Sequence, residues 1–221
     1  KLTWFGERAE FSLDGQRVLF LSKTFGDAME VEMETGIIRN LTAHYRHLGY
    51  TRAMYLANGD ILLAGPTEFD PENPNAGRTH SWLFVLKPGS NAPPHPLGVK
   101  CAEGPAVSRR RMHIAWSYRA AQFPGEMPAG SSQMHEADIV YEQGVPKLAN
   151  PRKILDSRDL PFQATLEPQN YRPPQERELI FSAYDYQHSE AFGVDLTTGK
   201  LTNYSNGPGV YDEPEGIFPS G

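Results

Sequence analysis

The chain has 221 residues, of which 39% are hydrophobic and 11% aromatic, and it carries 20 Gly and 19 Pro. This composition indicates a turn-rich globular chain that is long enough to bury a sizeable core. The net charge of −6 argues against nucleic acid or an anionic membrane as the main partner, no run approaches the ~20 apolar residues of a membrane span, and the single Cys101 leaves no internal disulfide.

A short phrase followed by an apolar run recurs along the chain. Phe11–Gly15 precedes Val18–Leu21, and Tyr55–Gly59 precedes Ile61–Ala64. Ile217–Gly221 opens the phrase a third time. Because an Asp-Gly or Asn-Gly turn beside an apolar run is a hairpin signal, each complete occurrence predicts the first two strands of a repeated unit.

A second phrase closes the units. Thr35–Thr42 and Thr198–Thr202 each run from a Gly turn to a Leu-Thr pair, and Lys1–Thr3 ends in the same pair. The sequence therefore starts at the end of one unit and stops at the opening of another. From this we expect the parent protein to begin before Lys1 and to continue past Gly221.

The spacing of these phrases matches a repeat architecture. With weaker openings near Ala106–Ser108 and Ala164–Leu166, four repeats between Gly15 and Gly221 average about 52 residues, within the range of propeller blades. Chance recurrence of Gly turns in an ordinary β protein is the alternative. Two separate phrases that keep the same order favour the repeat.

Each unit reads as four short antiparallel strands, and no stretch offers a helical period over three turns free of Pro and Gly. The expected strands are Ala9–Ser12, Arg17–Ser22, Ala28–Met33 and Ile37–Leu41 in the first unit, and Glu178–Tyr184, Glu190–Leu196 and Leu201–Tyr204 in the fourth. The prediction is an all-β protein: a β-propeller with four-stranded antiparallel blades, in a partial array of about four blades. One domain over 1–221 holds blades near 9–49, 50–100, 101–160 and 161–208, and a fifth begins at 209.

The repeated phrases resemble those of the TolB-like, WD-like β-propeller repeat family, in which F-S-P-D-G precedes a strand and a Gly turn leads to a Leu-Thr closure. The matching residues are Ser12, Asp14, Gly15, Gly36, Leu41 and Thr42, with Leu13 in place of the usual Pro. The third unit departs from the pattern, because Arg109–Arg111 stands where the turn belongs. The resemblance covers nearly the whole chain and implies the fold more closely than a function, since propellers serve as scaffolds, lyases and hydrolase lids.

Propeller topology indicates which side chains can meet. Connections that enter the inner strands and loops between the second and third strands open on one face, around the central channel. The inner-strand connections carry His47, Arg52, Glu103, Gln163, Glu213 and Glu215, and the second-to-third-strand loops carry His135 and His188. We expect these side chains to share a polar funnel, although funnel polarity in a propeller is also explained by solvent exposure alone.

The funnel inventory suffices for acid–base work on an anionic sugar. Arg52, His135 and His188 are the candidate catalytic residues, and His47, Glu103, Glu213 and Glu215 the candidate substrate-binding residues. His135, His188 and Gln163 are the candidate ligands of a divalent metal, Mn or Ca. One TolB-like family comprises oligogalacturonate-type lyases with a metal held by His and Gln, so the resemblance points the same way.

Three functions from different classes remain open. The first is a carbohydrate-active propeller, most plausibly a polysaccharide lyase acting on an acidic, uronate-containing oligosaccharide. The second is a non-catalytic TolB-like scaffold that binds a protein partner. The third is the propeller lid of a serine peptidase whose catalytic domain is absent, since no G-x-S-x-G phrase occurs. For each, the expected compartment is secreted or periplasmic.

Three smaller features have structural explanations as well as functional ones. His113 lies between Met112 and Ile114 in a strand and is expected to be structural. Cys101 is expected to be a small buried hydrophobe rather than a nucleophile. The sequons Asn40-Leu41-Thr42 and Asn203-Tyr204-Ser205 lie near closing strands, where the repeat phrase itself accounts for part of the pattern.

Overall fold

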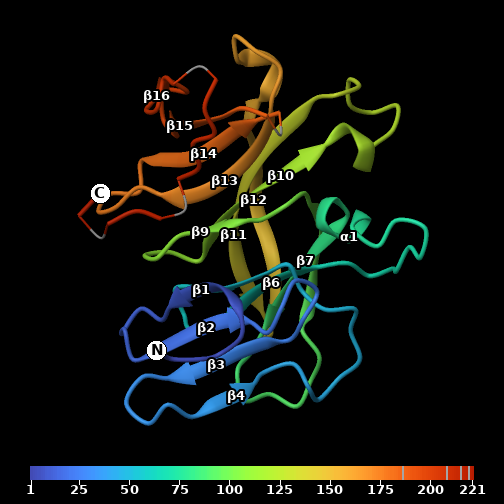
Figure 1. Cartoon of the computed structure of the whole chain (residues 1–221), viewed down its shortest axis with the longest axis vertical. Helices are drawn as coiled ribbons and strands as arrows, with labels where there is room; N and C mark the ends of the chain where they lie inside the picture. Colours follow the sequence, from blue (N-terminus) through green and yellow to red (C-terminus); the bar gives the residue numbers. More distant parts are fainter. Residues whose placement is uncertain (186, 208, 215, 219) are drawn as a thin grey trace. The chain divides into compact units, whose positions relative to one another are not determined.

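The computed structural model describes residues 1–185, 187–207, 209–214, 216–218 and 220–221, and over these the chain is all-β. Four sheets, each of four antiparallel strands, follow one another along the sequence (Figure 1). The prediction of an all-β propeller with four-stranded antiparallel blades is confirmed in fold class. The only α-helix among the described residues, α1 (Ala76–Thr79), spans four residues. No helix among the residues that the structure describes is long and apolar enough to cross a membrane.

The strand bounds follow the turn signals of the sequence. The first sheet holds β1 (Glu7–Phe11), β2 (Arg17–Leu21), β3 (Ala28–Glu32) and β4 (Ile38–Asn40). The second holds β5 (Arg52–Tyr55), β6 (Ile61–Gly65), β7 (Ser81–Leu86) and β8 (His95–Cys101). In both sheets the strands are ordered as they occur in the chain, which is the order of a meander joined by short connections.

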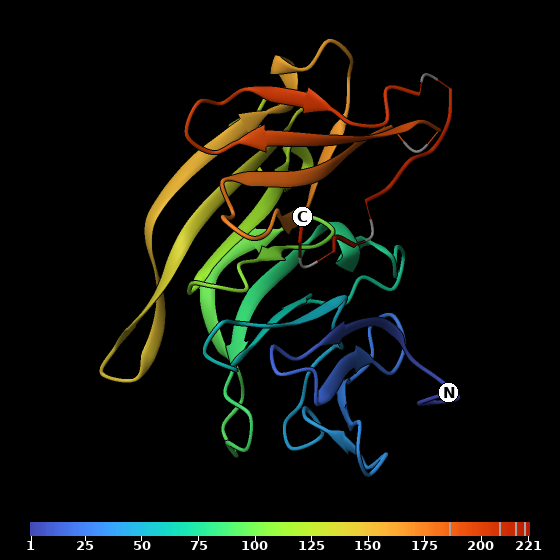
Figure 2. The same ribbon diagram turned by 90° about the vertical axis from the view of Figure 1, so that its left-hand side faces the viewer.

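The third sheet holds β9 (Ala106–Val107), β10 (His113–Arg119), β11 (Ser132–Glu142) and β12 (Val145–Asp156). The fourth holds β13 (Thr165–Tyr171), β14 (Glu178–Tyr184), β15 (Ser189–Asp195) and β16 (Leu201–Asn203). Strands β11 and β12 are the longest and run side by side as an extended hairpin, coloured yellow to gold in Figure 2. Two 3₁₀ turns, Ala120–Gln122 and Ser157–Asp159, follow β10 and β12.

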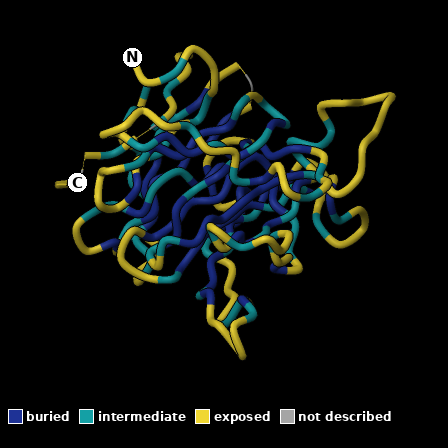
Figure 3. Tube along the Cα trace, turned by 90° about the horizontal axis from the view of Figure 1, so that it is seen from below, coloured by how far each residue is buried: buried dark blue, intermediate teal, exposed yellow. Residues whose placement is uncertain are grey.

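The chain divides into two compact units. Unit 1 comprises residues 1–103, 109–112 and 139–148, and unit 2 comprises residues 104–108, 113–138 and 149–221. In unit 1 the buried cluster includes Leu19, Leu21, Tyr55, Ile61 and Leu63. In unit 2 it includes Met134, Leu166, Leu179, Phe181 and Phe192. Strands β2, β6 and β14 are almost wholly buried, whereas β4 and much of β12 are not, and Figure 3 colours the trace by burial.

One position expected in a loop lies in a strand instead. His135 was expected at the end of the long connection after Tyr118, but β11 already begins at Ser132, and His135 pairs with Trp116 of β10. The connection is shorter than expected because Ser132 pairs with Arg119, so the hairpin closes around residues 120–131. The His135 side chain is therefore held in the sheet.

A hydroxyl group fastens the last strand of a blade to the third. In the first sheet Thr42 Oγ1 donates to Asp27 Oδ1 at 2.9 Å and accepts the Ala28 N–H at 3.1 Å. Thr42 is fully buried, and the backbone N–H of Leu41 donates to Ala28 O. The closing Leu-Thr phrase is thus a structural fastening, here called the closing hydroxyl.

The fourth sheet repeats this fastening with different residues. Ser205 Oγ donates to Glu190 Oε2 at 2.7 Å and accepts the Ala191 N–H at 3.0 Å, while the Tyr204 N–H donates to Ala191 O. Ser205 and Thr42 are also the hydroxyl residues of the two sequons. Their pattern in the sequence is accounted for by the blade closure.

Candidate functional site

A pocket of about 840 Å³ lies in unit 1 beside the β4–β5 connection, and it is here called the β4–β5 pocket. Its lining comes from the connections β2–β3, β4–β5, β6–β7 and β7–β8 and from strand β7. The lining residues are Asp27, Ala43, Tyr45, Arg46, His47, Leu48, Tyr50, Pro66, Thr67, Phe84, Pro93 and Pro94. A volume of this size is typical of sites that hold a small ligand or a short segment of chain.

The β4–β5 connection is fixed in place by backbone pairing. Tyr50 exchanges hydrogen bonds with the β2–β3 connection: its N–H donates to Gly26 O at 2.9 Å, and its carbonyl accepts the Phe25 N–H at 3.0 Å. Gly49 has φ +85°, and a Cβ there would lie 1.9 Å from Phe25 O. Only glycine fits this approach, and the approach brings His47 against Asp27.

Asp27 and His47 form the polar end of the pocket. His47 Nδ1 accepts the Gly49 N–H at 2.9 Å, so its proton is on Nε2, which donates to Asp27 Oδ1 at 3.1 Å. The same carboxylate oxygen accepts the closing hydroxyl of Thr42. Both ring nitrogens of His47 are therefore occupied within the protein, and the ring is held in one orientation.

Aromatic rings and prolines form the wall. The His47 ring stacks on Tyr50 with centroids 4.9 Å apart. The Tyr45 ring lies beside His47, and its hydroxyl is 2.9 Å from the hydroxyl of Tyr50. Burial raises the pKa of Tyr50 to about 12, and burial with the hydrogen bond to Tyr50 raises the pKa of Tyr45 further. Both phenols stay protonated at neutral pH, so they contribute hydroxyl groups and ring faces but no charge.

Arg46 supplies the positive charge of the pocket. It is exposed, and within the part of the chain that the structure describes it makes no ion pair. Asp27, the only carboxylate among the described lining residues, is already bonded to His47 and Thr42. The guanidinium of Arg46 is thus available to an outside carboxylate, for which its planar fork of donors is suited.

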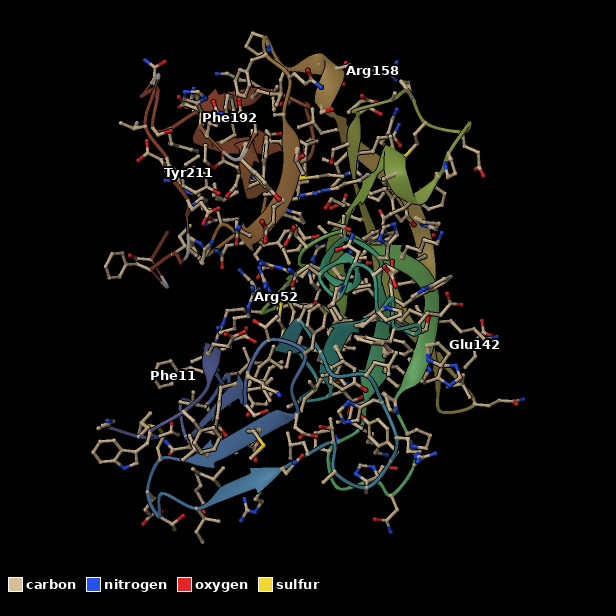
Figure 4. The ribbon with its side chains drawn as sticks, turned by 45° about the vertical axis from the view of Figure 1, so that its right-hand side comes forward. Phe11, Arg52, Glu142, Arg158, Phe192 and Tyr211 are labelled. Carbon is tan, nitrogen blue, oxygen red and sulfur yellow. The ribbon has the colours of Figure 1, made fainter. Side chains whose placement is uncertain are left out.

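The other predicted residues of unit 1 lie apart from His47. Arg52 begins β5, where its Nη1 donates to Thr51 O at 3.1 Å (Figure 4). Glu103 is buried, and its carboxylate pairs with Arg78 at 3.5 Å. The contacts of His47 in the described chain are with Asp27, Gly49 and the rings of Tyr45 and Tyr50, and none reaches Arg52 or Glu103.

In unit 2, His135 packs into the third sheet. Its ring stacks on Trp116 with centroids 6.0 Å apart, and Nε2 lies 3.3 Å from Gln133 Oε1. Burial, and then the charge of Lys153, lower the pKa of His135 to about 4. Gln163 lines a different hollow of about 510 Å³ with Arg158 and Phe162, where its Nε2 lies beside Gly130.

His188 and Glu213 are exposed. His188 Nδ1 lies 3.4 Å from Asp185 Oδ2, and Glu213 Oε1 accepts the Tyr211 hydroxyl at 2.9 Å (Figure 4 labels Tyr211). Glu215 lies outside the described residues. No group of three or more His, Cys, Asp or Glu side chains among the described residues is placed to hold a metal ion. The polar side-chain contacts of His135 and His188 are with Gln133 and Asp185. The Mn or Ca site on His135, His188 and Gln163 stays a prediction.

Of the residues that line the β4–β5 pocket, the sequence predicts only His47 as a site residue. Asp27, Phe84 and the paired prolines Pro93 and Pro94 are not among the candidates. The signal that the sequence offers for Asp27 is its place just before the third strand of the blade that Thr42 closes. That pairing becomes visible only once the closing hydroxyl is known.

Comparisons with known proteins give the fold and nothing finer. No family model matches the chain, and no curated protein matches it. Among solved structures, the putative TolB from Agrobacterium tumefaciens is 12% identical with a TM-score of 0.60, covering 91% of this chain and 62% of that one. A puromycin-hydrolyzing peptidase of Mycobacterium tuberculosis is 14% identical with a TM-score of 0.51, covering 92% and 31%.

A third match lies in the nidogen/laminin complex, at 10% identity and a TM-score of 0.54, covering 88% of this chain and 62% of that one. This chain therefore spans at most 62% of the length of these three solved chains. At such identities the likeness concerns architecture alone: the chain has the β-propeller fold of these neighbours.

Proposed function

We propose that the chain is a non-catalytic binding scaffold whose β4–β5 pocket holds an extended, acidic segment of a protein partner. The observation that carries this proposal is Arg46: an exposed guanidinium without an ion pair among the described residues, at a pocket walled by aromatic rings and prolines. A carboxylate-bearing segment complements that charge.

The wall favours an extended peptide. Tyr45 and Phe84 offer large rings with few rotatable bonds, backed by the buried Tyr50, and such rings bind extended or proline-rich segments at low entropic cost. The hydrogen-bonded hydroxyl pair of Tyr45 and Tyr50 and the Asp27–His47 contact hold the wall before a ligand arrives. A preformed wall lowers the ordering cost of binding.

The chemistry of the pocket supports binding over catalysis. Its described lining contains no Ser or Cys, and the one His has both ring nitrogens engaged by protein groups. Nidogen, a fold neighbour, was solved in complex with laminin, which makes a protein partner a reasonable ligand class for this fold. Peptidases are also among the fold neighbours, so a propeller that acts as the lid of a peptidase remains open as another non-catalytic role.

The lyase hypothesis stays a prediction, with Arg52, His135 and His188 as catalytic residues, Mn or Ca as metal and an acidic oligosaccharide as substrate. So does the secreted or periplasmic location. Incubation of the purified chain with polygalacturonate, with and without Mn²⁺ or Ca²⁺, tests the lyase through the ultraviolet absorbance of unsaturated uronates. The scaffold proposal expects no such absorbance.

The direct test is selection of a random-peptide phage library on the purified chain. Selected peptides are expected to carry Asp or Glu next to Pro or aromatic residues. Because hydrogen bonds to charged groups contribute about 1.5–3 kcal/mol, Arg46→Ala should weaken their binding by about tenfold or more. Tyr45→Ala should weaken it as well, through loss of the ring face.

Arg39→Ala is the matched control. Arg39 is an exposed arginine of the same unit that lies within 4.0 Å of Glu30 and 3.9 Å of Glu32 and does not line the pocket. Its removal should leave peptide binding unchanged. Selected peptides without acidic residues, or equal loss of binding in Arg39→Ala and Arg46→Ala, would contradict the proposal.

A further inference from the structure

A second hollow, of about 560 Å³, lies in unit 2 at the ends of two hairpins of the fourth sheet, between the β13–β14 and β15–β16 turns. We call it the Arg177 pocket. Its lining residues are Arg172, Pro173, Pro174, Gln175, Arg177, Glu178, Asp195, Lys200, Thr202 and Ser220. Three cations, two carboxylates and several neutral donors therefore face one space.

Both carboxylates of the pocket are already satisfied by protein groups. Asp195 Oδ1 accepts the backbone N–H groups of Thr197 and Thr198 at 2.9 and 2.7 Å, and these bonds hold the pKa of Asp195 below its usual range. Glu178 accepts the Tyr204 hydroxyl at 2.7 Å and the Arg172 guanidinium at 3.1 Å. Neither acid needs a further cation.

Two of the three cations of the pocket form no ion pair with its carboxylates. Arg172 is bonded to Glu178 and Tyr204, but Arg177 and Lys200 are exposed and make no ion pair within the described ranges of the chain. Arg177 lies near enough to Asp195 to favour its ionised form, yet Asp195 takes its hydrogen bonds from backbone groups. The pocket thus holds two positive charges that the protein does not neutralise by contact.

We infer that the Arg177 pocket binds a tetrahedral dianionic group, as in phosphate, sulfate or a small monoester of either. Two cations match a dianion in charge, and the Arg177 fork can bond two of its oxygens while Lys200 acts as a point charge on a third. The hydroxyl groups of Thr202 and Ser220 and the amide of Gln175 supply neutral donors. The pocket volume of about 560 Å³ is larger than the volume of one such anion, which leaves room for the organic part of an ester.

The test is calorimetric titration of the purified chain in chloride buffer with three probes: inorganic phosphate, inorganic sulfate and glycerol 3-phosphate. The inference expects saturable binding with one site per chain. Arg177→Ala and Lys200→Ala should each weaken it about tenfold or more, because each removes a charged donor. Tighter binding of glycerol 3-phosphate than of inorganic phosphate would identify an ester as the ligand, and equal binding a free anion.

Lys87→Ala is the matched control, because Lys87 is an exposed lysine just after β7, where the corresponding hairpin of the second sheet turns. Its removal should leave the titration unchanged, and circular dichroism melting should show that all three variants fold. The inference is overturned if no probe saturates, or if Arg177→Ala and Lys200→Ala bind the probes as tightly as the unmodified chain does.

Discussion

Glu10 is a carboxyl group that folding removes from most of its water. Its side chain is 19% exposed, its Oε2 accepts the Tyr55 N–H at 2.8 Å, and Arg109 lies 3.9 Å away. Burial raises the pKa of Glu10 to about 7, and the Tyr55 hydrogen bond and Arg109 only partly oppose it. In the folded chain Glu10 therefore takes up a proton at a pH where the unfolded chain has released it.

This difference gives stability a defined pH dependence. Between the unfolded value near 4.5 and the folded value near 7 the native state binds more protons, so the free energy of unfolding falls as pH rises through this window. Glu10→Gln keeps the acceptor for Tyr55 and should remove the fall. At pH 8 the variant is expected to be more stable, by at most about 3 kcal/mol.

Urea unfolding of both proteins at pH 5 and pH 8 measures the effect. Glu142→Gln serves as the control, since Glu142 is 63% exposed at the end of β11 and pairs with Lys147 (Figure 4). A pH slope that is unchanged in Glu10→Gln would show that Glu10 is ionised in the folded chain without cost.

His135 titrates in the opposite sense. Its folded pKa of about 4 lies below the usual value of 6.5, so the unfolded chain binds more protons between these values and stability falls as pH drops through them. Proton NMR of the ring signals should give a midpoint near pH 4 for His135. A midpoint near 6.5 would mean that solvent reaches His135 beside Trp116.

At the scale of elements, the closing hydroxyl should determine how firmly a blade's last strand is held. Thr42→Val and Ser205→Ala each remove an acceptor for a backbone N–H and a donor to a carboxylate. A buried group left without its partner costs about 1–3 kcal/mol. Each variant should lose stability of that order in chemical unfolding, with the larger loss at the fully buried Thr42.

Thr197→Val is the control for this prediction, because Thr197 is exposed in the turn before β16 and its hydroxyl forms no hydrogen bond in the described chain. It should change stability by less than about 0.5 kcal/mol. If Thr197→Val and Thr42→Val lower the free energy of unfolding equally, the closing hydroxyl does not stabilise the blade.

The strands themselves were largely readable from sequence, and their fastenings were not. Asp14–Gly15 and Thr198–Gly199 announced hairpins because only a few residue types tolerate such turns, and the structure places strands on both sides of each. The partner of Thr42 is 15 residues away across β3 and β4, a separation at which no local pattern exists. In the third sheet, β9 has only two residues, too few for an alternation to be seen.

The same limit explains the candidate site. The propeller topology predicted from the sequence assigns residues to a funnel by the connection in which they occur. It does not show which side chains already form contacts with neighbouring residues. His47 turned toward Asp27, Glu103 toward Arg78, and His135 into β11. The β4–β5 pocket depends instead on Gly49, whose close approach to Phe25 has no counterpart in residue type or spacing beyond a single glycine.

At the scale of the whole molecule, the net charge of −6 and the guanidinium of Arg46 at the pocket act at different ranges. An acidic peptide is repelled by the overall charge at long distance and attracted by Arg46 only on contact. Salt screens charges that are separated by more than about 8–10 Å, and the exposed contact is weakened as well. Association and dissociation should therefore both become faster as salt is raised.

Stopped-flow fluorescence with a peptide from the phage selection can separate the two rates between about 10 mM and about 150 mM salt. The association rate constant is expected to rise over this range, which is the reverse of electrostatic steering toward an oppositely charged partner. In Arg46→Ala the rise in association should persist, because the overall repulsion remains, while the salt dependence of dissociation should flatten. An association rate that falls with salt would mean that local attraction outweighs the acidic surface, and the charge of the whole chain would then have no part in selecting the partner.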